Sequence, residues 1–317
     1  MIGLLLILAF GLFVTIAATT WWTIRRLRRP PRRTYASAVA RGRPGEPSEL
    51  ATPRQWDAWI ASCKVGGQTL DLPVWDIAGD EPSAPVIVCT PGWGDSKVGA
   101  LVRVEALAPI ASRIIAWDPP GHGEAPGLCS LGLREHEAIA AIVDQLSDDA
   151  QNRGVVLYGW SLGAGASVVA AAEMANLGVV VGVIAEAPYR MPQTPARNVI
   201  LNASMPWRIN GPLAFWLLGV ELGVGPKWRG FDRVEHARRL SCPLLVAQGS
   251  LDEVCPVDDG RAIASAAPLG LFVEIQGGHH SDLWTDERFS TPFQSVVVDF
   301  VRSLGLPTRS APTTVET

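Results

Sequence analysis

The stretch VVLYGWSLGAG, residues 155–165, predicts a strand, a sharp turn and a helix. A β-branched apolar run opens it and breaks at Gly159, and small and apolar residues then continue to Met174 without a proline. Ser161 lies at the apex of the turn, with a glycine two residues before it and another two residues after it. A serine held in a strained turn at the end of a strand needs small residues at those two positions. Ser161 is therefore the candidate nucleophile.

Composition indicates a globular chain with a large core. Of 317 residues, 48% are hydrophobic and 18% are charged, which favours one α/β domain with appendages. Cysteines are odd in number, scattered and without a Cys-x-x-Cys pair, which argues against a disulfide framework and a zinc site. They are Cys63, Cys89, Cys129, Cys242 and Cys255.

Charge is distributed unevenly along the chain. Eight arginines and no acidic residue precede Glu46, which leaves 19 of the 27 basic residues and all 31 acidic residues in the remainder, a net charge of −12. An acidic globular part is a poor binder of nucleic acid, so we expect no nucleic-acid partner.

The amino-terminal segment, residues 2–24, is apolar and long enough to cross a hydrocarbon core of about 30 Å as a helix. A cleaved signal peptide carries its positive charge before the apolar core, whereas here the charge follows it. We therefore expect an uncleaved single-pass membrane anchor rather than a signal peptide. The positive-inside rule then places the remainder of the chain on the cytoplasmic side. The flanking arginines are Arg25, Arg26, Arg28, Arg29, Arg32 and Arg33.

A basic, proline-rich segment, residues 25–55, follows the anchor and is predicted to be a flexible juxtamembrane linker whose arginines lie on anionic headgroups. Trp56, Trp59 and Ile60 are spaced as one face of a short helix at the start of the main domain, residues 56–306. Residues 307–317 are predicted to be disordered.

Strands and helices alternate along the main domain. A hairpin is expected first, with its turn at the glycine pair 66–67. The expected strands are 63–65, 69–77, 86–90, 113–117, 155–159, 179–185, 244–248 and 272–275, and the expected helices are 98–107, 134–146, 162–174 and 293–304. This alternation predicts an α/β fold with a doubly wound, mostly parallel sheet. Residues 189–239 do not alternate, and we expect an inserted helical cap over the carboxyl edge of the sheet.

Five motifs follow one another along the chain, and together they resemble the α/β-hydrolase superfamily. They are Pro-Gly-Trp-Gly at 91–94, Asp-Pro-Pro-Gly-His-Gly at 118–123, the serine turn, and the pair Gly-Ser-Leu-Asp at 249–252 and Gly-Gly-His-His-Ser-Asp at 277–282. The order Ser, Asp, His is the order of that fold. Pro91 departs from the family pattern, which usually has histidine there.

The resemblance implies a catalytic triad of Ser161, Asp252 and His280. Ser161 would attack an acyl carbonyl, His280 would accept its proton, and Asp252 would orient the imidazole. The backbone N–H groups of Trp93 and Leu162 would form the oxyanion hole. Two rivals remain open: His279 for the base and Glu186 for the acid.

The Trp, Phe and Leu content of residues 189–239, on a domain tethered at a bilayer, favours a hydrophobic acyl substrate. The chain therefore resembles the lysophospholipase, monoacylglycerol lipase and protein depalmitoylase branch of the family, and we expect a membrane-anchored serine hydrolase acting on a lipophilic ester or thioester. A serine aminopeptidase is an alternative, in which Glu221 or Glu186 would hold the free amino group. A catalytically silent membrane scaffold is another. No phosphate loop, dinucleotide fingerprint or metal-ligand pattern is found, so we expect no cofactor and no metal. The expected partners are a small-molecule or lipid acyl substrate and the membrane.

Overall fold

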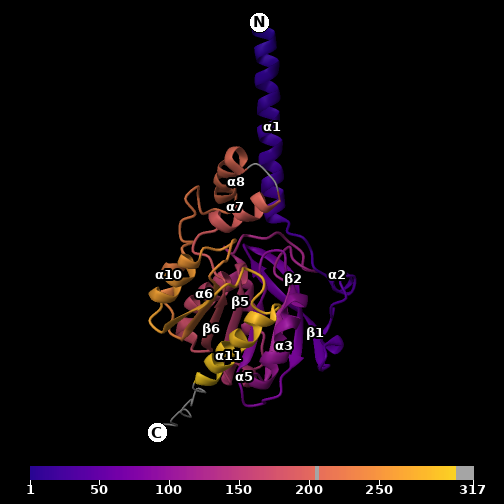
Figure 1. Cartoon of the computed structure of the whole chain (residues 1–317), viewed down its shortest axis with the longest axis vertical. Helices are drawn as coiled ribbons and strands as arrows, with labels where there is room; N and C mark the ends of the chain where they lie inside the picture. Colours follow the sequence, from indigo (N-terminus) through magenta and orange to yellow (C-terminus); the bar gives the residue numbers. More distant parts are fainter. Residues whose placement is uncertain (204–206, 305–317) are drawn as a thin grey trace, which may run out of the picture.

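The computed structural model describes residues 1–203 and 207–304. Its centre is a sheet with the strand order β1-β2-β4-β3-β5-β6-β7-β8 (Figure 1). The pairs β1–β2 and β2–β4 are antiparallel, and all other neighbours in this sheet are parallel. The strands are β1 (Trp56–Val65), β2 (Gln68–Ala78), β3 (Val86–Thr90), β4 (Arg113–Trp117), β5 (Val155–Trp160), β6 (Val180–Glu186), β7 (Leu244–Gly249) and β8 (Gly270–Ile275).

Both faces of the sheet are covered by helices, because successive side chains of a strand point to opposite faces. In β5, Val155 and Leu157 belong to one buried cluster, while Val156 and Tyr158 belong to another. The first cluster is closed by α4 (Glu135–Asp144), α6 (Leu162–Glu173) and α10 (Val257–Ala266), and the second by α3 (Leu101–Leu107) and α11 (Glu287–Ser303). The predicted doubly wound, mostly parallel sheet is confirmed.

The start of the main domain differs from the prediction. Trp56, Trp59 and Ile60 lie in strand β1 and not in a short helix. β1 pairs with β2 along its whole length, and the turn between them places Gly66 and Gly67 at φ of +57° and +82°. Two residues with positive φ suit a tight hairpin turn, and the ladder of backbone hydrogen bonds outweighs the local helical spacing.

An insertion between β6 and β7 lies over the carboxyl ends of the parallel strands, where the cap was expected. It contains α7 (Gln193–Asn202), α8 (Trp207–Glu221) and α9 (Arg233–Ala237). Helix α9 packs on α6 and α10 of the main domain, whereas α7 and α8 stand above the sheet edge beside the lower end of α1 (Figure 1). The cap proper is therefore α7 and α8.

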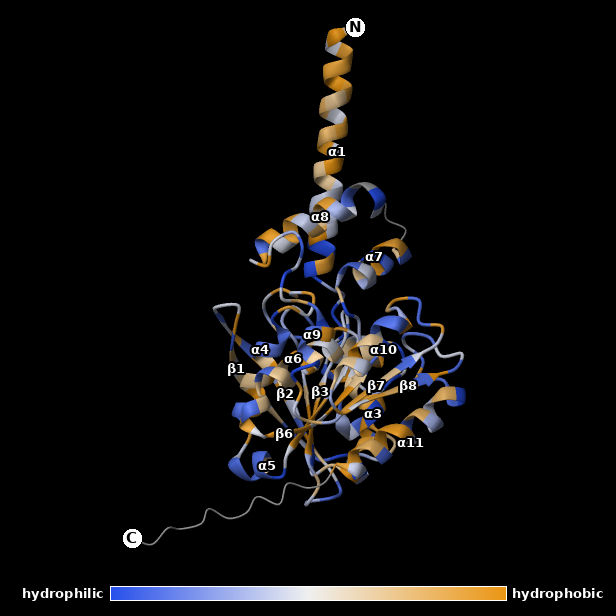
Figure 2. Ribbon diagram, turned by 90° about the vertical axis from the view of Figure 1, so that its left-hand side faces the viewer, coloured by the Kyte–Doolittle hydropathy of each residue, from blue (hydrophilic) through white to orange (hydrophobic). Residues whose placement is uncertain are grey.

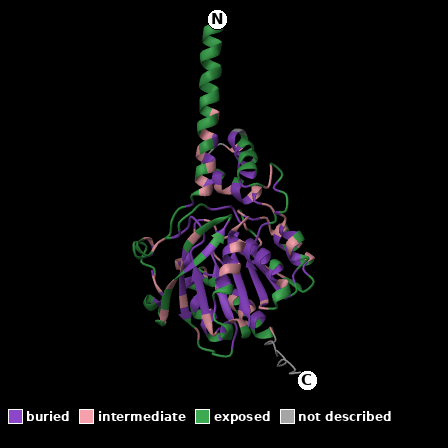
Figure 3. Ribbon diagram, turned by 180° about the vertical axis from the view of Figure 1, so that it is seen from behind, coloured by how far each residue is buried: buried purple, intermediate pink, exposed green. Residues whose placement is uncertain are grey.

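Helix α1 (Ile2–Arg28) is long and apolar enough to cross a membrane, and it is the only such helix in the described residues. Figure 3 shows its upper part exposed on all sides. From Thr20 onward it packs against α8, and Thr23 and Leu27 are buried there. Length and composition alone are also compatible with a signal sequence.

The segment predicted as a linker follows the domain surface after α1. Arg32 donates to the carbonyl of Gly123 at 3.0 Å, and Arg33 pairs with Asp95 at 3.1 Å. The remaining short elements are α2 (Tyr35–Val39), α5 (Asp148–Asn152), η1 (Pro47–Glu49), η2 (Lys97–Ala100), η3 (Ala108–Ile110) and η4 (Ala175–Leu177). The whole of the predicted tail, residues 307–317, lies outside the described residues, as do 305 and 306.

Candidate active site

Ser161 stands between β5 and α6 in a backbone conformation that non-glycine residues rarely adopt, with φ of 54° and ψ of −115°. Its two flanking glycines are required sterically. A Cβ on Gly159 would lie 2.2 Å from the carbonyl oxygen of Gly163, and a Cβ on Gly163 would lie 2.0 Å from that of Thr90. The Gly-x-Ser-x-Gly spacing thus lets the turn close against β3 and presents the serine at the sheet edge.

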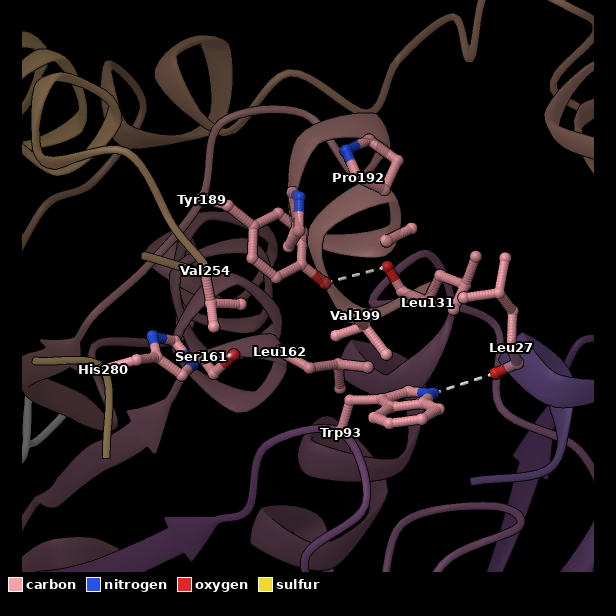
Figure 4. Close-up of a pocket in the computed structure, with 12 residues that line it drawn as sticks. Leu27, Trp93, Leu131, Ser161, Leu162, Tyr189, Pro192, Val199, Val254 and His280 are labelled. Carbon is pink, nitrogen blue, oxygen red and sulfur yellow. Dashed lines mark hydrogen bonds between the residues drawn. The ribbon is translucent and has the colours of Figure 1, made fainter. Parts of the chain in front are cut away.

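The structure brings the three predicted triad residues together. Nε2 of His280 lies 3.1 Å from Oγ of Ser161, and its Nδ1 lies 2.8 Å from Oδ2 of Asp252 (Figure 4 shows the first pair). Asp252 follows β7 and His280 follows β8, so both come from neighbouring carboxyl ends of the sheet. The second oxygen of Asp252 accepts from the N–H groups of Val254 and Cys255, at 2.9 and 2.8 Å. These bonds hold the carboxylate toward the imidazole.

His279, the rival base, lies outside this arrangement. Its ring contacts Glu253 at 3.2 Å, and more than half of its side chain is exposed. Its backbone N–H donates to Asp282 at 2.8 Å, which fixes the loop so that the next residue turns inward.

Glu186, the rival acid, is buried in a separate polar network. Its carboxylate accepts from Arg103 at 2.9 Å and from the hydroxyl of Tyr158 at 2.8 Å. The indole N–H of Trp284 donates to it at 2.9 Å. Arg190, only four residues further along the chain, binds Asp232 instead. Glu186 therefore balances a buried arginine beneath the site.

Glu186→Gln is expected to destabilise the fold, because it leaves the Arg103 guanidinium buried without a counter-charge. Removing one partner of a buried ion pair costs about 3–5 kcal/mol, which corresponds to a fall in Tm of about 10 °C for a domain of this size. Thermal unfolding followed by circular dichroism measures it. Adding Arg103→Met should recover part of the loss, and an unchanged Tm in the single variant would refute the assignment.

The sequence predicts that two backbone N–H groups, those of Trp93 and Leu162, form an oxyanion hole. Leu162 is the first residue of α6, and Trp93 lies in the turn after β3. A Cβ on Gly92 would lie 3.1 Å from Cβ of Ser161, so this turn rests directly against the serine. Within the described residues neither N–H donates to a carbonyl or side chain. Both donors are thus available.

A cavity of about 120 Å³ opens from Ser161 and His280 and is otherwise mostly apolar (Figure 4). Its other lining residues are Leu27, Trp93, Leu131, Leu162, Tyr189, Pro192, Pro195, Ala196, Val199 and Val254. Leu27 belongs to α1, so the end of the apolar helix forms one wall. The indole N–H of Trp93 donates to the carbonyl of Leu27 at 2.9 Å. Sequence reasoning missed this wall, because no local pattern links residue 27 to residue 93.

Cys255 is buried beside the triad. Its sulfur, a carboxylate oxygen of Asp252 and a ring nitrogen of His280 lie within 4.8 Å of one another, the one group in the described chain that resembles a metal site. However, Asp252 and His280 already bind each other. Burial raises the pKa of the Cys255 thiol, which keeps it protonated near neutral pH and makes it a poor ligand. The hydrogen bonds of His280 with Asp252 and with Ser161 account for this cluster.

The pKa of His280 lies well above its ordinary value of 6.5. Burial acts to lower this pKa, but hydrogen bonds from the imidazolium to the Cys255 sulfur and to the Asp252 carboxylate, together with the charge of that carboxylate, more than offset the effect of burial. A histidine that accepts a proton from Ser161 must first be neutral.

We therefore expect kcat/KM to rise with pH through an apparent pKa above 6.5, because the base is inactive while protonated. Asp252→Asn should lower this apparent pKa as well as the rate. A pH–rate profile of ester hydrolysis measures both. A wild-type profile already at its plateau at about pH 6 would contradict the expectation.

Comparisons with known proteins show the family to which this chain belongs and the fold that it shares. The model of the "Alpha/beta hydrolase family" matches residues 86–294. An esterase from Pyrococcus furiosus is similar in structure, with a TM-score of 0.63, 16% identity, and coverage of 87% of this chain and 98% of that one. An esterase from Rhodococcus sp. has a TM-score of 0.54 at 22% identity, and the match covers 78% of this chain and 99% of that one. A bromoperoxidase from Bacillus anthracis has a TM-score of 0.55 at 16% identity, and the match covers 78% of this chain and 100% of that one. A search of curated protein sequences finds no significant match.

Identities this low show the fold alone. The fold and the family model together define a hydrolase of α/β architecture. The chain belongs to the alpha/beta hydrolase family.

Proposed function

We propose that this chain is a membrane-anchored serine hydrolase that cleaves a carboxylic ester or thioester of a lipophilic acyl group. The observation that carries the proposal is the hydrogen-bonded series from Asp252 through His280 to Ser161, which opens into an apolar cavity.

The reaction would proceed in two halves. Oγ of Ser161 attacks the acyl carbonyl while Nε2 of His280 takes its proton, and the N–H groups of Leu162 and Trp93 bind the oxyanion. The imidazolium returns the proton to the leaving alcohol or thiol as the C–O or C–S bond breaks. Water, deprotonated by His280, then attacks the acyl-enzyme and releases the acid and Ser161.

The lining of the cavity supports an acyl group as the occupant. An apolar cavity of about 150 Å³ holds a ligand the size of benzene, so this cavity accommodates the first few carbons of a chain. A longer chain would extend past Leu27 and Val199, between α1 and α7.

Two observations disfavour the alternatives. An aminopeptidase needs a free acid near the serine, but Glu186 is bound to Arg103, and Glu221 pairs with Arg28 at 2.8 Å. A silent scaffold has no need of an assembled triad. Ester or thioester cleavage remains the better proposal.

The membrane part of the proposal rests on α1. The helix is apolar over its first 23 residues and ends in arginines, and these properties support an anchor with the hydrolase domain on the cytoplasmic side.

Leu27→Trp tests the substrate assignment, because the larger side chain fills the far wall of the cavity. We expect kcat/KM for p-nitrophenyl octanoate to fall about tenfold or more relative to p-nitrophenyl acetate. Leu177→Trp, at an exposed leucine of η4 away from the cavity, is the matched control and should change kcat/KM for neither ester. An equal fall for both esters, or no fall, would place the acyl chain elsewhere.

A further inference from the structure

Helix α8 carries a second apolar face that no part of the described chain covers. Leu213, Trp216, Leu217 and Val220 are exposed, and their spacing of three, one and three residues places them on one side of the helix. The opposite side, with Ala214, Phe215 and Leu218, is buried, and α8 packs against α1 and α7. Four large apolar side chains on one exposed face indicate an interaction surface.

The position of α8 along α1 identifies what this surface meets. The amide of Asn210 donates to the carbonyl of Thr19 at 3.3 Å and to the hydroxyl of Thr23, and Glu221 at the other end of α8 binds Arg28. At 1.5 Å per residue, about 20 residues of α1 cross a hydrocarbon core. Thr19–Thr23 then lies where α1 leaves the hydrocarbon, and α8 lies at the same level (Figures 1 and 2).

The charges around α8 match an anionic membrane surface. Arg208, Lys227 and Arg229 are exposed at its two ends. A groove between the ends of α1 and α8 is lined by Trp21, Ile24, Arg25, Arg28, Arg29, Leu128 and Glu221. An apolar stripe flanked by cations, with tryptophan at the same level, is typical of a helix lying in the lipid interface.

We propose that the exposed face of α8 is a bilayer-binding surface, seated in the interface of the leaflet from which α1 emerges. The proposal rests on the proposed anchoring by α1 and goes beyond it, because it fixes the tilt of the domain as well as its tether. The cavity, walled by Leu27 of α1 and Val199 of α7, then adjoins the same leaflet. A lipophilic acyl substrate would pass from the bilayer to Ser161 without crossing water.

Site-directed fluorescence tests this on the full chain in liposomes of phosphatidylcholine and phosphatidylglycerol. All five native cysteines are buried, so a single introduced cysteine takes the environment-sensitive probe NBD. The positions are Val220→Cys on α8, Leu8→Cys on α1 and Leu177→Cys in η4, all exposed apolar residues in this structure. Hydrolysis of a water-soluble ester by each labelled variant shows that the fold is intact.

We expect spin-labelled lipid to quench the probes at positions 8 and 220 at least about twofold and to leave position 177 unquenched. Quenching at 8 but not at 220 would overturn the α8 surface while leaving the anchor intact. No quenching at 8 would overturn the anchor and this proposal together. A third contrary result is that the emission of the probe at position 220 shifts to the blue only when the number of chains per liposome rises, with no quenching by lipid. That result would overturn the bilayer-binding surface and indicate that α8 binds a second copy of this chain.

Discussion

Ser161→Ala is expected to lower kcat/KM for a soluble ester by about 10⁴-fold or more, because no other hydroxyl is placed against Nε2 of His280 in the described structure. The backbone should be little affected, since alanine meets the same positive φ that serine already tolerates. Steady-state hydrolysis and thermal unfolding together measure the two effects.

Ser83→Ala is the matched control for this variant. Ser83 is exposed and binds only its neighbour Glu81, and its loss should leave turnover unchanged. If Ser161→Ala retained turnover while folded, Ser161 would not be the nucleophile.

His280→Ala should reduce kcat/KM by about 10³-fold or more, because it removes the base that contacts both Ser161 and Asp252. His279→Ala should reduce it far less, since His279 faces solvent beside Glu253. The two variants differ by one position in one loop, so their ratio measures which ring is the base. Steady-state kinetics of both variants with the same soluble ester measures this ratio.

The reverse order, with His279→Ala the more damaging, would mean that the loop after β8 is arranged differently from the structure. Equal and small effects would exclude the triad altogether.

The sheet was predictable because its strands are continuous apolar runs that local pattern detects. β3 and β4 coincide with their predicted ranges, and the turn around Ser161 follows from the close approach of Gly159 and Gly163. The motifs also located the three candidate triad residues, since each lies in the loop or turn that follows a strand, and parallel strands end at one edge of the sheet.

The features that the sequence did not predict depend on contacts between residues far apart in the chain. β1 is a strand because β2 pairs with it. Glu186 serves the fold because Arg103, 83 positions earlier, meets it in the core. Leu27 reaches the cavity because α1 packs on α8, and no periodicity within either helix specifies the other. Packing partners of this kind decide which polar residues are structural and which are free to react.

Labelling by a fluorophosphonate probe tests the central claim most directly, since the probe bonds to a serine only when an adjacent base activates it. The full chain in detergent is treated with the probe, and the modified residue is located by mass spectrometry of its peptides. We predict that wild type is labelled at Ser161 and that Ser161→Ala is not labelled. A folded wild type that stays unlabelled, or labelling that persists in Ser161→Ala, would contradict an assembled Ser161–His280–Asp252 triad.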